Sequence, residues 1–586
     1  MRRSGVLAVF LAFIVAAPLL LPEFYVTLLN YIGLATLVSL GLVLLTGVAG
    51  LVSFGQQAFV GLAAYATAVL TTGYGVSPWL TLFAGLAVTA LVALFLGVIT
   101  LRLSGHYLSL STIAWGIALY FLFGNLAFLG QYSGIDNLPP VSIFGWALDS
   151  GRKSYYLIWI VTVAALIAAQ NLLDSRSGRA IRALRFRSVM AESFAVNTSA
   201  LKVMVFLYAA LLAGLSGWLY AHFLRFVSPH AFGVNAGIDY LFMAVIGGAG
   251  QVWGAVIGAS VLTVLKEWLK DLLPKLFQQT GNYEIVVFGV LMVLLLQRTR
   301  DGLVPAFSRL LPAGPQPARP ADAPVLGRRT QPRAGERILE VDGLQKHFGG
   351  LIAVNGLSFD MKSGEILGLI GPNGAGKSTV FNLITGVLRA DTGEIRFLGE
   401  GIEGVSQRDI ALRGICRTFQ HVNLVSGMSA LENAALGAHH RGSKGTVAAM
   451  LRTDRQEEKQ LLAEAARQLE RVGLGGHLFE PAGSLPLGQQ RIVEIARALC
   501  ADPVLLLLDE PAAGLRYGEK RALADLLRRL RDEGMSILLV EHDMEFVMGL
   551  VDRLVVMDFG EKLAEGLPAD IQANPAVVEA YLGGIE

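Results

Sequence analysis

The apolar run Ile366-Leu367-Gly368-Leu369-Ile370 leads directly into the glycine-rich stretch Gly371-Pro372-Asn373-Gly374-Ala375-Gly376-Lys377-Ser378-Thr379. The run predicts a buried strand, and the stretch has the strand–GxxxxGKS/T–helix arrangement. Its glycines let successive backbone N–H groups wrap around a polyphosphate, and the following helix adds its N-terminal dipole. We expect all nine residues of the stretch to contact ATP. Lys377 should reach the β- and γ-phosphates, and the Ser378 hydroxyl should bind Mg²⁺.

A second apolar run, Val504 to Leu508, predicts another buried strand that ends at Asp509 and Glu510. A carboxylate at the carboxyl end of such a strand suits Mg²⁺ coordination through water, which is the role expected for Asp509. Glu510 is then placed to polarise the attacking water as a general base. A surface carboxylate that merely closes the strand is the alternative for Glu510.

Three further segments accompany these two motifs: Arg417-Thr418-Phe419-Gln420, Ser484-Leu485-Pro486-Leu487-Gly488-Gln489-Gln490-Arg491 and Leu539-Val540-Glu541-His542-Asp543. In this order and spacing they resemble the glutamine loop, signature segment and histidine switch of ATP-binding cassette (ABC) ATPases. The resemblance covers 338–586 and implies an α/β P-loop domain with a helical subdomain. It also implies that two cassettes sandwich two ATP molecules, each held between one P-loop and the other cassette's signature segment.

The same resemblance assigns roles to single residues. Phe348 would stack on adenine, although core packing is an alternative for a lone aromatic. Gln420 would sense Mg²⁺ and couple to the membrane domain, and His542 would contact the γ-phosphate alongside Glu510 and Lys377. Three signature residues would contact ATP on the opposite cassette: Leu487, Gly488 and Gln489. Pro486 replaces the usual Ser and Arg516 the usual Asp, which weakens any claim that the two ATP sites are equivalent.

The composition divides the chain in two. Residues 1–300 hold 17 Lys and Arg and 9 Asp and Glu, whereas 301–586 hold 31 and 37. The first half is therefore charge-poor with a net charge of +8, and the second has the charge content of a soluble domain. This division excludes one uniform globular protein, a disordered chain and a disulfide scaffold. The two cysteines, Cys416 and Cys500, show no metal-binding spacing and suit a reducing compartment.

Apolar stretches of about 20 residues, long enough to cross a bilayer, recur through the first half. They predict an all-α polytopic membrane domain over 1–300, with about eight spans and a broken region. The predicted spans are 5–21, 26–46, 50–70, 79–101, 108–129, 155–172, 203–224 and 282–297, with the broken region at 238–266. Buried helices of a large soluble core are the alternative, but so few charges leave them no solvated face.

The positive-inside bias orients these spans. Arg2 and Arg3 place the N-terminus in the cytoplasm, and six crossings then bring the basic loop 173–202 to the same side. The last span must emerge in the cytoplasm, so 225–281 must contain an even number of crossings. The run Ile246-Gly247-Gly248-Ala249-Gly250-Gln251 therefore predicts two half-helices that meet at a glycine turn, as a re-entrant hairpin or two short spans.

Between the halves, 301–337 contains seven prolines and six arginines. This composition favours a polyproline-like tether from Pro312 to Pro332, with an ordered docking segment as the alternative.

The basic loop also resembles the coupling segment of bacterial importer permeases. The matching stretches run from Gly178 and Arg179 to Leu184 and from Ala191 and Glu192 to Asn197. The resemblance implies that this segment docks in a groove of the cassette near Gln420. A solvated basic amphipathic loop is the alternative reading. Short cytoplasmic loops and more than six crossings favour an importer over an exporter.

Four passages resemble the permease of the high-affinity branched-chain amino acid importers: 41–47, 53–59, 101–107 and 247–250. The cassette is similar to the ATP-binding subunit of those systems, so the chain is identified as a fusion of the two subunits. The resemblance implies import driven by ATP and Mg²⁺ across a bacterial inner membrane, with the ATPase domain in the cytoplasm. It also implies a second permease and a second cassette (or a second copy of this chain), a periplasmic substrate-binding protein and no nucleic acid.

The resemblance allows several substrates. Related systems also carry urea, short amides and other amino acids, and an ATPase for signalling or remodelling without translocation is an alternative of another class. Few polar side chains lie in the predicted spans. Ser53, Gln56, Gln57 and Asn125 are candidates for the pathway, but each is also explained as a hydrogen bond between packed helices.

Overall fold

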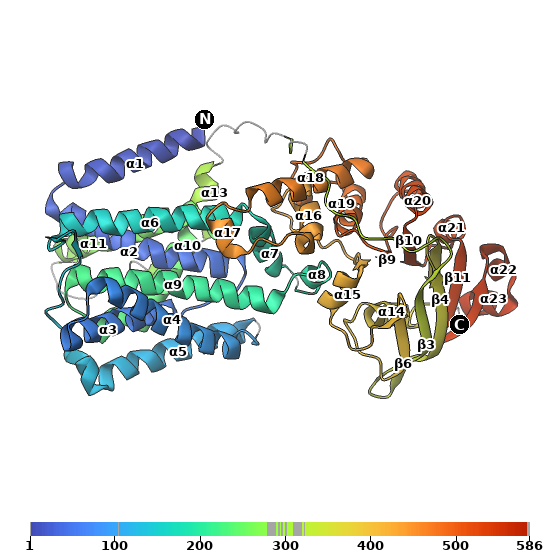
Figure 1. The fold of residues 1–586 in the computed structure, drawn as a ribbon, viewed down its shortest axis with the longest axis horizontal. Coiled ribbons are helices and arrows are strands. Elements are labelled where there is room, and N and C mark those ends of the chain that lie inside the picture. The colour runs from blue at the N-terminus through green and yellow to red at the C-terminus, as the bar shows by residue number, and fades with distance from the viewer. Residues whose placement is uncertain are drawn as a thin grey trace. The chain divides into compact units, whose positions relative to one another are not determined.

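A computed structural model provides the fold of the chain (Figure 1). It describes residues 2–103, 105–186, 188–277, 302–308, 319–320 and 323–582, with seven further positions between 287 and 298. The chain forms two compact units, which are treated separately below. The first unit comprises 1–174 and 199–315, and the second comprises 175–198 and 316–586.

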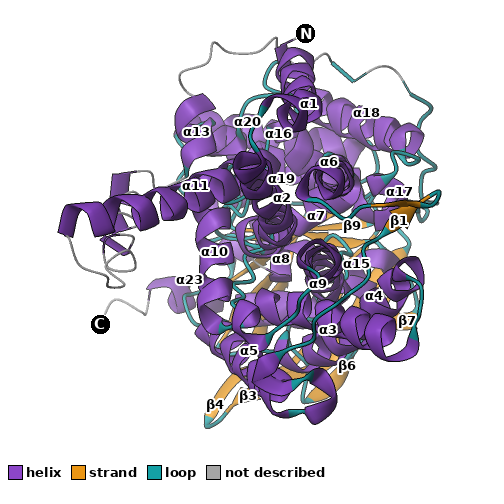
Figure 2. Ribbon diagram, turned by 90° about the vertical axis from the view of Figure 1, so that its left-hand side faces the viewer, coloured by secondary structure: helices purple, strands orange, loops and turns teal. Residues whose placement is uncertain are grey.

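The first unit is almost entirely helical, and its long helices run side by side (Figure 1). Figure 2 views several of them nearly end-on. The larger elements are α1 (Arg2–Leu20), α2 (Glu23–Leu42), the π-helix η1 (Val43–Val48), α3 (Gln56–Tyr74), α4 (Pro78–Thr100), α5 (His106–Asn125), α6 (Gly151–Leu173), α9 (Thr198–Leu224), α10 (Val234–Gly248), α11 (Val252–Phe277) and α13 (Leu303–Ser308). The smaller ones are η2 (Ala127–Leu129), η3 (Gln131–Ser133), β1 (Ser142–Ile143), β2 (Trp146–Ala147) and η4 (Pro229–Phe232).

Six helical stretches among the described residues are long and apolar enough to cross a membrane: Glu23–Val48, Pro78–Thr100, His106–Asn125, Gly151–Leu173, Thr198–Leu224 and Val252–Leu273. The first of them, α2 with η1, is also the most buried and forms the centre of the bundle. α2 packs closely against α9 at Gly41, where a Cβ would lie 3.0 Å from the Ala209 backbone. The predicted span at 282–297 lies mostly outside the described residues.

The predicted span 50–70 is wrong at its start. Residues 49–55 have no helical structure, and α3 begins only at Gln56. The reason is local hydrogen bonding: Phe54 N donates to Thr112 Oγ1 of α5 at 3.1 Å, and Gly55 N donates to Ser53 Oγ at 3.5 Å. These bonds take the backbone out of the helical path in a stretch whose apolar residues resemble a continuous span.

The predicted break near 246–251 is present, but the two half-helices are only partly right. α10 has 15 residues, too few to cross the hydrocarbon core, whereas α11 has 26. They pack closely: a Cβ on Gly258 would overlap the Met243 carbonyl oxygen. After the incompletely described stretch, Gly302 returns to this turn, since its Cβ would lie 2.6 Å from Gly248 N. α13 therefore follows at the end of the bundle that holds the α10–α11 turn.

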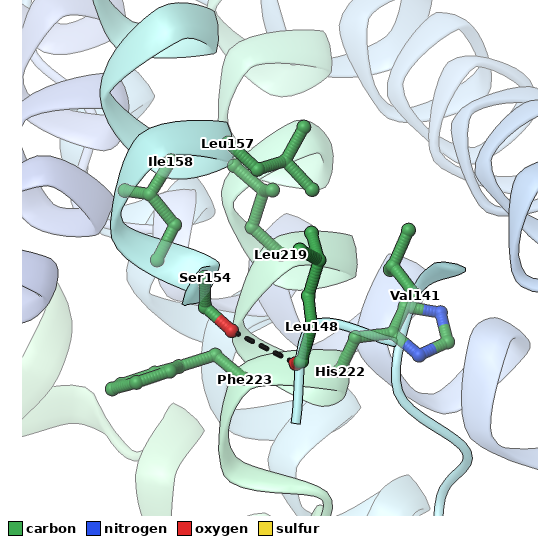
Figure 3. A pocket seen from close by; sticks show the side chains of 8 residues that line it. All are labelled: Val141, Leu148, Ser154, Leu157, Ile158, Leu219, His222 and Phe223. Carbon is green, nitrogen blue, oxygen red and sulfur yellow. Dashed lines mark hydrogen bonds between the residues drawn. The ribbon is translucent and has the colours of Figure 1, made fainter. Parts of the chain in front are cut away.

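A small apolar cavity lies where α6 and α9 meet the segment 141–148 (Figure 3). Ser154 Oγ donates to Leu148 O at 3.2 Å beside it. His222 lines the cavity and packs edge-on against Trp218, and its Nδ1 lies 2.8 Å from the Pro139 carbonyl oxygen. The bond to Pro139 joins the end of α9 to the segment before β1.

The second unit is built on two sheets. Its strands are β3 (Arg337–Phe348), β4 (Leu351–Lys362), β5 (Ile366–Ile370), β6 (Thr392–Phe397), β7 (Glu400–Gly401), β8 (Ile415–Arg417), β9 (Leu505–Asp509), β10 (Ser536–Val540), β11 (Arg553–Asp558) and β12 (Glu561–Gly566). The larger sheet has the order β12-β11-β5-β10-β9-β8 and is parallel except for β12. The smaller one, β4-β3-β6-β7, is antiparallel.

The strands predicted at 366–370 and 536–540 are confirmed as β5 and β10, and every residue of both is buried. Helices cover a parallel sheet on both faces, which explains strands that are apolar throughout rather than alternating. The helices of this unit are α7 (Arg176–Leu184), α8 (Ser188–Glu192), α14 (Lys377–Ile384), α15 (Gln407–Arg413), α16 (Ala430–Gly437), α17 (Thr446–Met450), α18 (Arg455–Arg471), α19 (Leu487–Cys500), α20 (Tyr517–Asp532), α21 (Met544–Met548), α22 (Pro568–Ala573) and α23 (Pro575–Leu582). Short 3₁₀ turns, η5 (Ala438–Arg441) and η6 (Ala482–Ser484), join them.

The described end of the linker is docked, so the tether predicted to Pro332 is wrong for this part. Residues 323–333 have no helix or strand, yet they are hydrogen-bonded to the cassette. Arg329 donates to Leu412 O at 3.0 Å, Gln331 to Pro503 O at 3.3 Å, and Arg441 to Gly327 O at 2.9 Å. Arg329 and Gln331 of the linker thus donate to cassette carbonyl oxygens, and the linker's Gly327 accepts from a cassette arginine.

Candidate functional site

The predicted phosphate loop lies between β5 and α14. Gly371, Gly374 and Gly376 have φ values of 154°, 87° and 97°, which only glycine adopts readily. Side chains at Gly371 and Gly376 would also overlap the carbonyl oxygens of Met557 and Ala353. The loop is therefore closely supported from behind, and the exposed Asn373 and Gly374 present its backbone on the outer side.

Lys377 begins α14, and its ammonium closes the loop. Nζ donates to the carbonyl oxygens of Gly371 and Pro372, each at 2.8 Å. Burial lowers the pKa of Lys377, and the carboxylates of Glu510 and Asp509 act in the opposite sense. The charges of Glu510 and Asp509 thus interact with the Lys377 ammonium, so the phosphate loop and the end of β9 form one site.

The ends of β5, β9 and β10 meet because parallel strands bring their carboxyl ends to one edge of the sheet. Val540 pairs with Asp509, and Glu510 N donates to Val540 O at 2.9 Å. Glu510 has a φ of 47°, a strained value for a residue with a side chain. Such strain is typical of residues whose side chain must point in a fixed direction at a functional site.

Glu510 lies between two of the other predicted site residues. Gln420 Nε2 donates to Glu510 Oε2 at 3.0 Å, and His542 Nδ1 lies 3.7 Å from the same oxygen. His542 follows β10 and keeps 56% of its side chain exposed. The structure thus brings Lys377, Asp509, Glu510, Gln420 and His542 to one place.

Asp509 is the best candidate ligand for a cation. Its Oδ2 accepts from Arg417 Nη2 at 2.9 Å, whereas Oδ1 is buried with no hydrogen-bond partner among the described residues. Burial raises the pKa of Asp509, and the Arg417 guanidinium opposes this. A buried carboxylate oxygen without a partner among the described residues fits the preference of Mg²⁺ for oxygen ligands.

Two arginines of this region are not predicted as site residues. Arg417 contacts Asp509 as well as Asn382 Oδ1, at 2.5 Å. Arg491 of α19 donates to Phe419 O at 2.8 Å and to Gln420 O, and so holds the glutamine loop. Both belong to motifs quoted from the sequence, but only the tertiary contacts reveal what they hold.

The signature residues lie apart from the phosphate loop. Leu487, Gly488 and Gln489 open α19, and no hydrogen bond in the described chain joins them to 371–379. Leu487 keeps 45% of its surface exposed. A Cβ on Gly488 would lie 2.8 Å from Glu519 Oε1, so the glycine allows α20 to approach. Phe348, at the end of β3, is also 45% exposed, which suits stacking rather than core packing.

The predicted coupling segment packs on the cassette within the second unit. Arg179 forms two hydrogen bonds with the Glu458 carboxylate of α18, and Arg182 contacts Glu432 Oε1 of α16 at 2.9 Å. Arg176 donates to Gly442 O at 2.5 Å and to Lys444 O at 2.7 Å. These bonds exclude a solvated loop, and they explain the cluster of arginines.

The remaining predicted residues of the segment differ in their roles. Gly178 N donates to the helix-capping Ser175 Oγ at 3.3 Å, and Ala191 is fully buried. Glu192 Oε1 accepts from Thr198 Oγ1 at 2.5 Å, which orders the chain before α9. Asn197 is exposed.

The segment reaches the glutamine loop through Arg497 of α19, a refinement of the predicted docking near Gln420. Phe194 stacks under the fully buried Arg497 at 4.8 Å. Arg497 in turn donates to Asn423 O at 2.9 Å, three residues after Gln420. Gln407 of α15 adds bonds to Val189 O at 3.0 Å and Ser193 Oγ at 2.5 Å.

Comparison with protein families matches three parts of the chain. Residues 24–296 match the family described as branched-chain amino acid transport system / permease component. Residues 354–513 match the ABC transporter family, and 561–586 match the family described as branched-chain amino acid ATP-binding cassette transporter.

Curated relatives match the cassette. The high-affinity branched-chain amino acid transport ATP-binding proteins LivG of Escherichia coli (strain K12) and BraF of Pseudomonas aeruginosa are each 44% identical over 249 residues. Each match covers 42% of this chain and 98% of the relative. The probable LivG of Methanocaldococcus jannaschii is 34% identical over 251 residues, 42% of this chain and 97% of the relative.

Solved structures of isolated cassettes are also similar. A nucleotide-free ATP-binding cassette from an ABC transporter is 32% identical, with a TM-score of 0.38, over 42% of this chain and 99% of that structure. A cassette in its ADP conformation is 33% identical with the same TM-score and coverage. A permease family and a cassette family thus match different parts of one chain, and the cassette matches nearly the full length of its curated relatives. The chain belongs to the branched-chain amino acid ABC transporter family and combines a membrane permease and a transport-coupled ATPase in one polypeptide.

Proposed function

We propose that the chain imports branched-chain amino acids across a bacterial inner membrane, as the fused permease and ATPase of a binding-protein-dependent importer. The observation that carries the proposal is the joining of the permease match at 24–296 to a cassette whose relatives are named for this transport. The domains are then the permease at 1–300, the linker at 301–337 and the cassette at 338–586.

In the proposed hydrolysis step, Glu510 takes a proton from the attacking water and His542 contacts the γ-phosphate. Gln420, bonded to Glu510 at 3.0 Å, holds that carboxylate in place. Lys377 and the backbone of 371–376 bind the phosphates, and Phe348 stacks on adenine. Asp509, Ser378 and Gln420 would hold Mg²⁺, which neutralises charge on the phosphates when bound.

The coupling segment supports a route from this chemistry to the permease. Arg491 holds the backbone of Gln420, and Arg497 of the same helix stacks on Phe194. Closure of two cassettes around ATP would move α19, and the attached segment would carry that movement to α6 and α9. Leu487, Gly488 and Gln489 would contact ATP on the second cassette.

The proposed assembly contains a second permease and a second cassette, or a second copy of this chain, with a periplasmic substrate-binding protein. A signature segment separate from its own phosphate loop supports a partner cassette. Native mass spectrometry of the detergent-purified complex distinguishes two copies of one chain from a mixed assembly.

Reconstitution tests the proposal. The full chain, with the subunits that copurify, is placed in liposomes with ATP on the cassette side and binding protein on the other. We expect ATP-dependent accumulation of labelled leucine above that of urea. Binding-protein-stimulated hydrolysis without accumulation would contradict import and favour a signalling role.

A further inference from the structure

The start of α3 lies at the middle of the membrane bundle. Ser216 Oγ of α9 donates to Leu34 O at 2.9 Å, and Leu34 is the twelfth of the 26 residues from Glu23 to Val48. The next residue of α9, Gly217, touches Val60, since its Cβ would overlap the Val60 carbonyl oxygen. Val60 is therefore level with the middle of the α2–η1 span. Gln56 begins α3 one turn earlier, about 6 Å away along the helix axis.

α10 begins at the same level. Gly237, its fourth residue, lies against α3, because its Cβ would be 2.5 Å from Phe54 O and would overlap Gln57 Oε1. The far end of α10 reaches the end of η1, where a Cβ on Gly47 would lie 2.5 Å from Gly250 N. α3 runs the other way: Gln57 lies against Gly237, whereas Gly61, one turn further along α3, lies against Phe232, which precedes α10. The two helices thus start together and diverge.

Two helix N-termini therefore meet inside an apolar bundle. Each N-terminus carries partial positive charge on N–H groups that lack a partner within the helix. The residues before them, Gly55 and Gly233, supply no side-chain cap. The non-helical stretch 49–55 leads to the same place. Irregular backbone at membrane depth is tolerated only where it is buried in protein or lines a cavity.

The two glutamine side chains at the start of α3 are buried with polar atoms that lack hydrogen-bond partners within the described chain. Gln56 and Gln57 are each 99% buried. Both amide atoms of Gln56, and Oε1 of Gln57, have no hydrogen-bond partner within the described chain. An unpaired buried amide is costly, and a native structure retains one where function requires it. The alternative of a hydrogen bond between packed helices therefore does not apply to Gln56.

The other two polar candidates are accounted for. Ser53 Oγ accepts from Gly55 N, and the exposed Asn125 donates to Phe121 O at 2.7 Å within its own helix. A cluster of aromatic rings lies next to Gly61, one turn along α3 from Gln57. It contains Tyr65 and Phe123, with centroids 4.9 Å apart, and Phe232.

We propose that Gln56, Gln57 and the facing N-termini of α3 and α10 form a site that binds the α-carboxylate of the transported amino acid. The inference rests on the proposed function, because it takes the substrate to be an amino acid. Helix N–H groups and glutamine Nε2 donate to the carboxylate, Gln56 Oε1 accepts from the α-ammonium group, and the aromatic cluster faces the apolar side chain.

Replacing each glutamine by methionine tests the site, because methionine has a similar length and no amide. Leucine uptake by the reconstituted full-chain complex should fall at least tenfold in Gln56→Met and Gln57→Met. The melting temperature of Gln56→Met should stay the same or rise, because an unpaired polar group is removed. Asn125→Leu serves as the matched control, with uptake within twofold of the parent.

The outcomes separate this inference from the function on which it rests. Parent uptake that persists within twofold in Gln56→Met overturns the site alone. A parent that accumulates no leucine overturns the proposed function and the site with it. If Gln56→Met loses both uptake and thermal stability, Gln56→Asn decides: a shortened amide that restores folding without restoring uptake supports the site, and restoration of both overturns it.

Discussion

Arg179 and Glu458 form an ion pair in which both side chains are more than nine-tenths buried. Each of two guanidinium nitrogens contacts a different carboxylate oxygen. A two-bond pair of this kind fixes the orientation of α7 on α18 and also pairs the two charges. The pair therefore determines where the coupling segment sits on the cassette.

Removing one partner of the Arg179–Glu458 ion pair should lower the stability of the folded chain. Arg179→Ala leaves Glu458 buried without its counter-charge, and we expect a loss of about 3–5 kcal/mol in the free energy of unfolding. Denaturant titration of the full chain measures it. Arg179→Met with Glu458→Leu should recover much of the loss. Arg528→Ala, from a largely exposed pair with Asp525, is the control and should change little. Equal effects at the two arginines would refute the argument.

Glu510→Gln should bind ATP normally and lose steady-state hydrolysis. The amide keeps the shape but accepts no proton, and loss of a general base lowers such rates about 10²- to 10⁴-fold. Nucleotide binding and phosphate release are measured on the same preparation. Asp525→Asn provides an exposed control carboxylate. Hydrolysis at the parent rate in Glu510→Gln would show that another group takes the proton.

Arg417→Met should shift the pH dependence of hydrolysis. Burial already raises the pKa of Asp509 and Arg417 opposes that rise, so the variant's Asp509 pKa should be higher still. A larger fraction of Asp509 is then protonated at a given pH, and the acid side of the rate profile moves to higher pH. Rates measured across the pH range at fixed Mg²⁺ test this. A profile that moves to lower pH would reverse the assigned sign.

Docking of the coupling segment should resist acid. Burial favours the neutral form of Glu432, but Arg182, the Ser429 N–H and Arg179 outweigh it and lower the pKa below 4.5. The Arg182–Glu432 contribution to stability is thus complete above the unfolded-state pKa and is lost as the pH falls through the lowered folded-state value. In Arg182→Met the folded-state pKa of Glu432 moves up toward the unfolded-state value, so this contribution shrinks and the melting temperature should fall less on acidification than in the parent. Coincident curves would exclude this contribution.

The α10–α11 hairpin should not tolerate a methyl group at its crossing. A Cβ on Gly258 would overlap the Met243 carbonyl oxygen, so Gly258→Ala must separate the helices. We expect a loss of at least about 1–3 kcal/mol, as for overpacked cores. Gly73→Ala is the control: nothing lies within 4 Å of the new Cβ, and alanine favours a helix by up to about 1 kcal/mol. Thermal unfolding of both variants decides, and a stable Gly258→Ala would argue against the close crossing.

The nucleotide loop and the strands β5 and β10 are predictable because their residues are contiguous and their patterns are local. The start of α3 is not, since 50–54 is mostly apolar and the bonds from Phe54 N to Thr112 and from Gly55 N to Ser53 remove it from a helix. The roles of Arg417 and Arg491 depend on partners 92 and 71 residues away in sequence. The coupling segment is recognisable from its arginines, but its carboxylates Glu432 and Glu458 lie 250 and 279 residues further on.

The coupling segment should stay docked on its cassette even when the protein is very dilute. It lies between α6 and α9, while the cassette that it grips follows later in the same polypeptide. Its docking is therefore a loop-closure equilibrium with an effective concentration, rather than an encounter between separate subunits. Diluting the protein in detergent should leave this grip intact, whereas a permease and cassette made as two chains would dissociate by mass action.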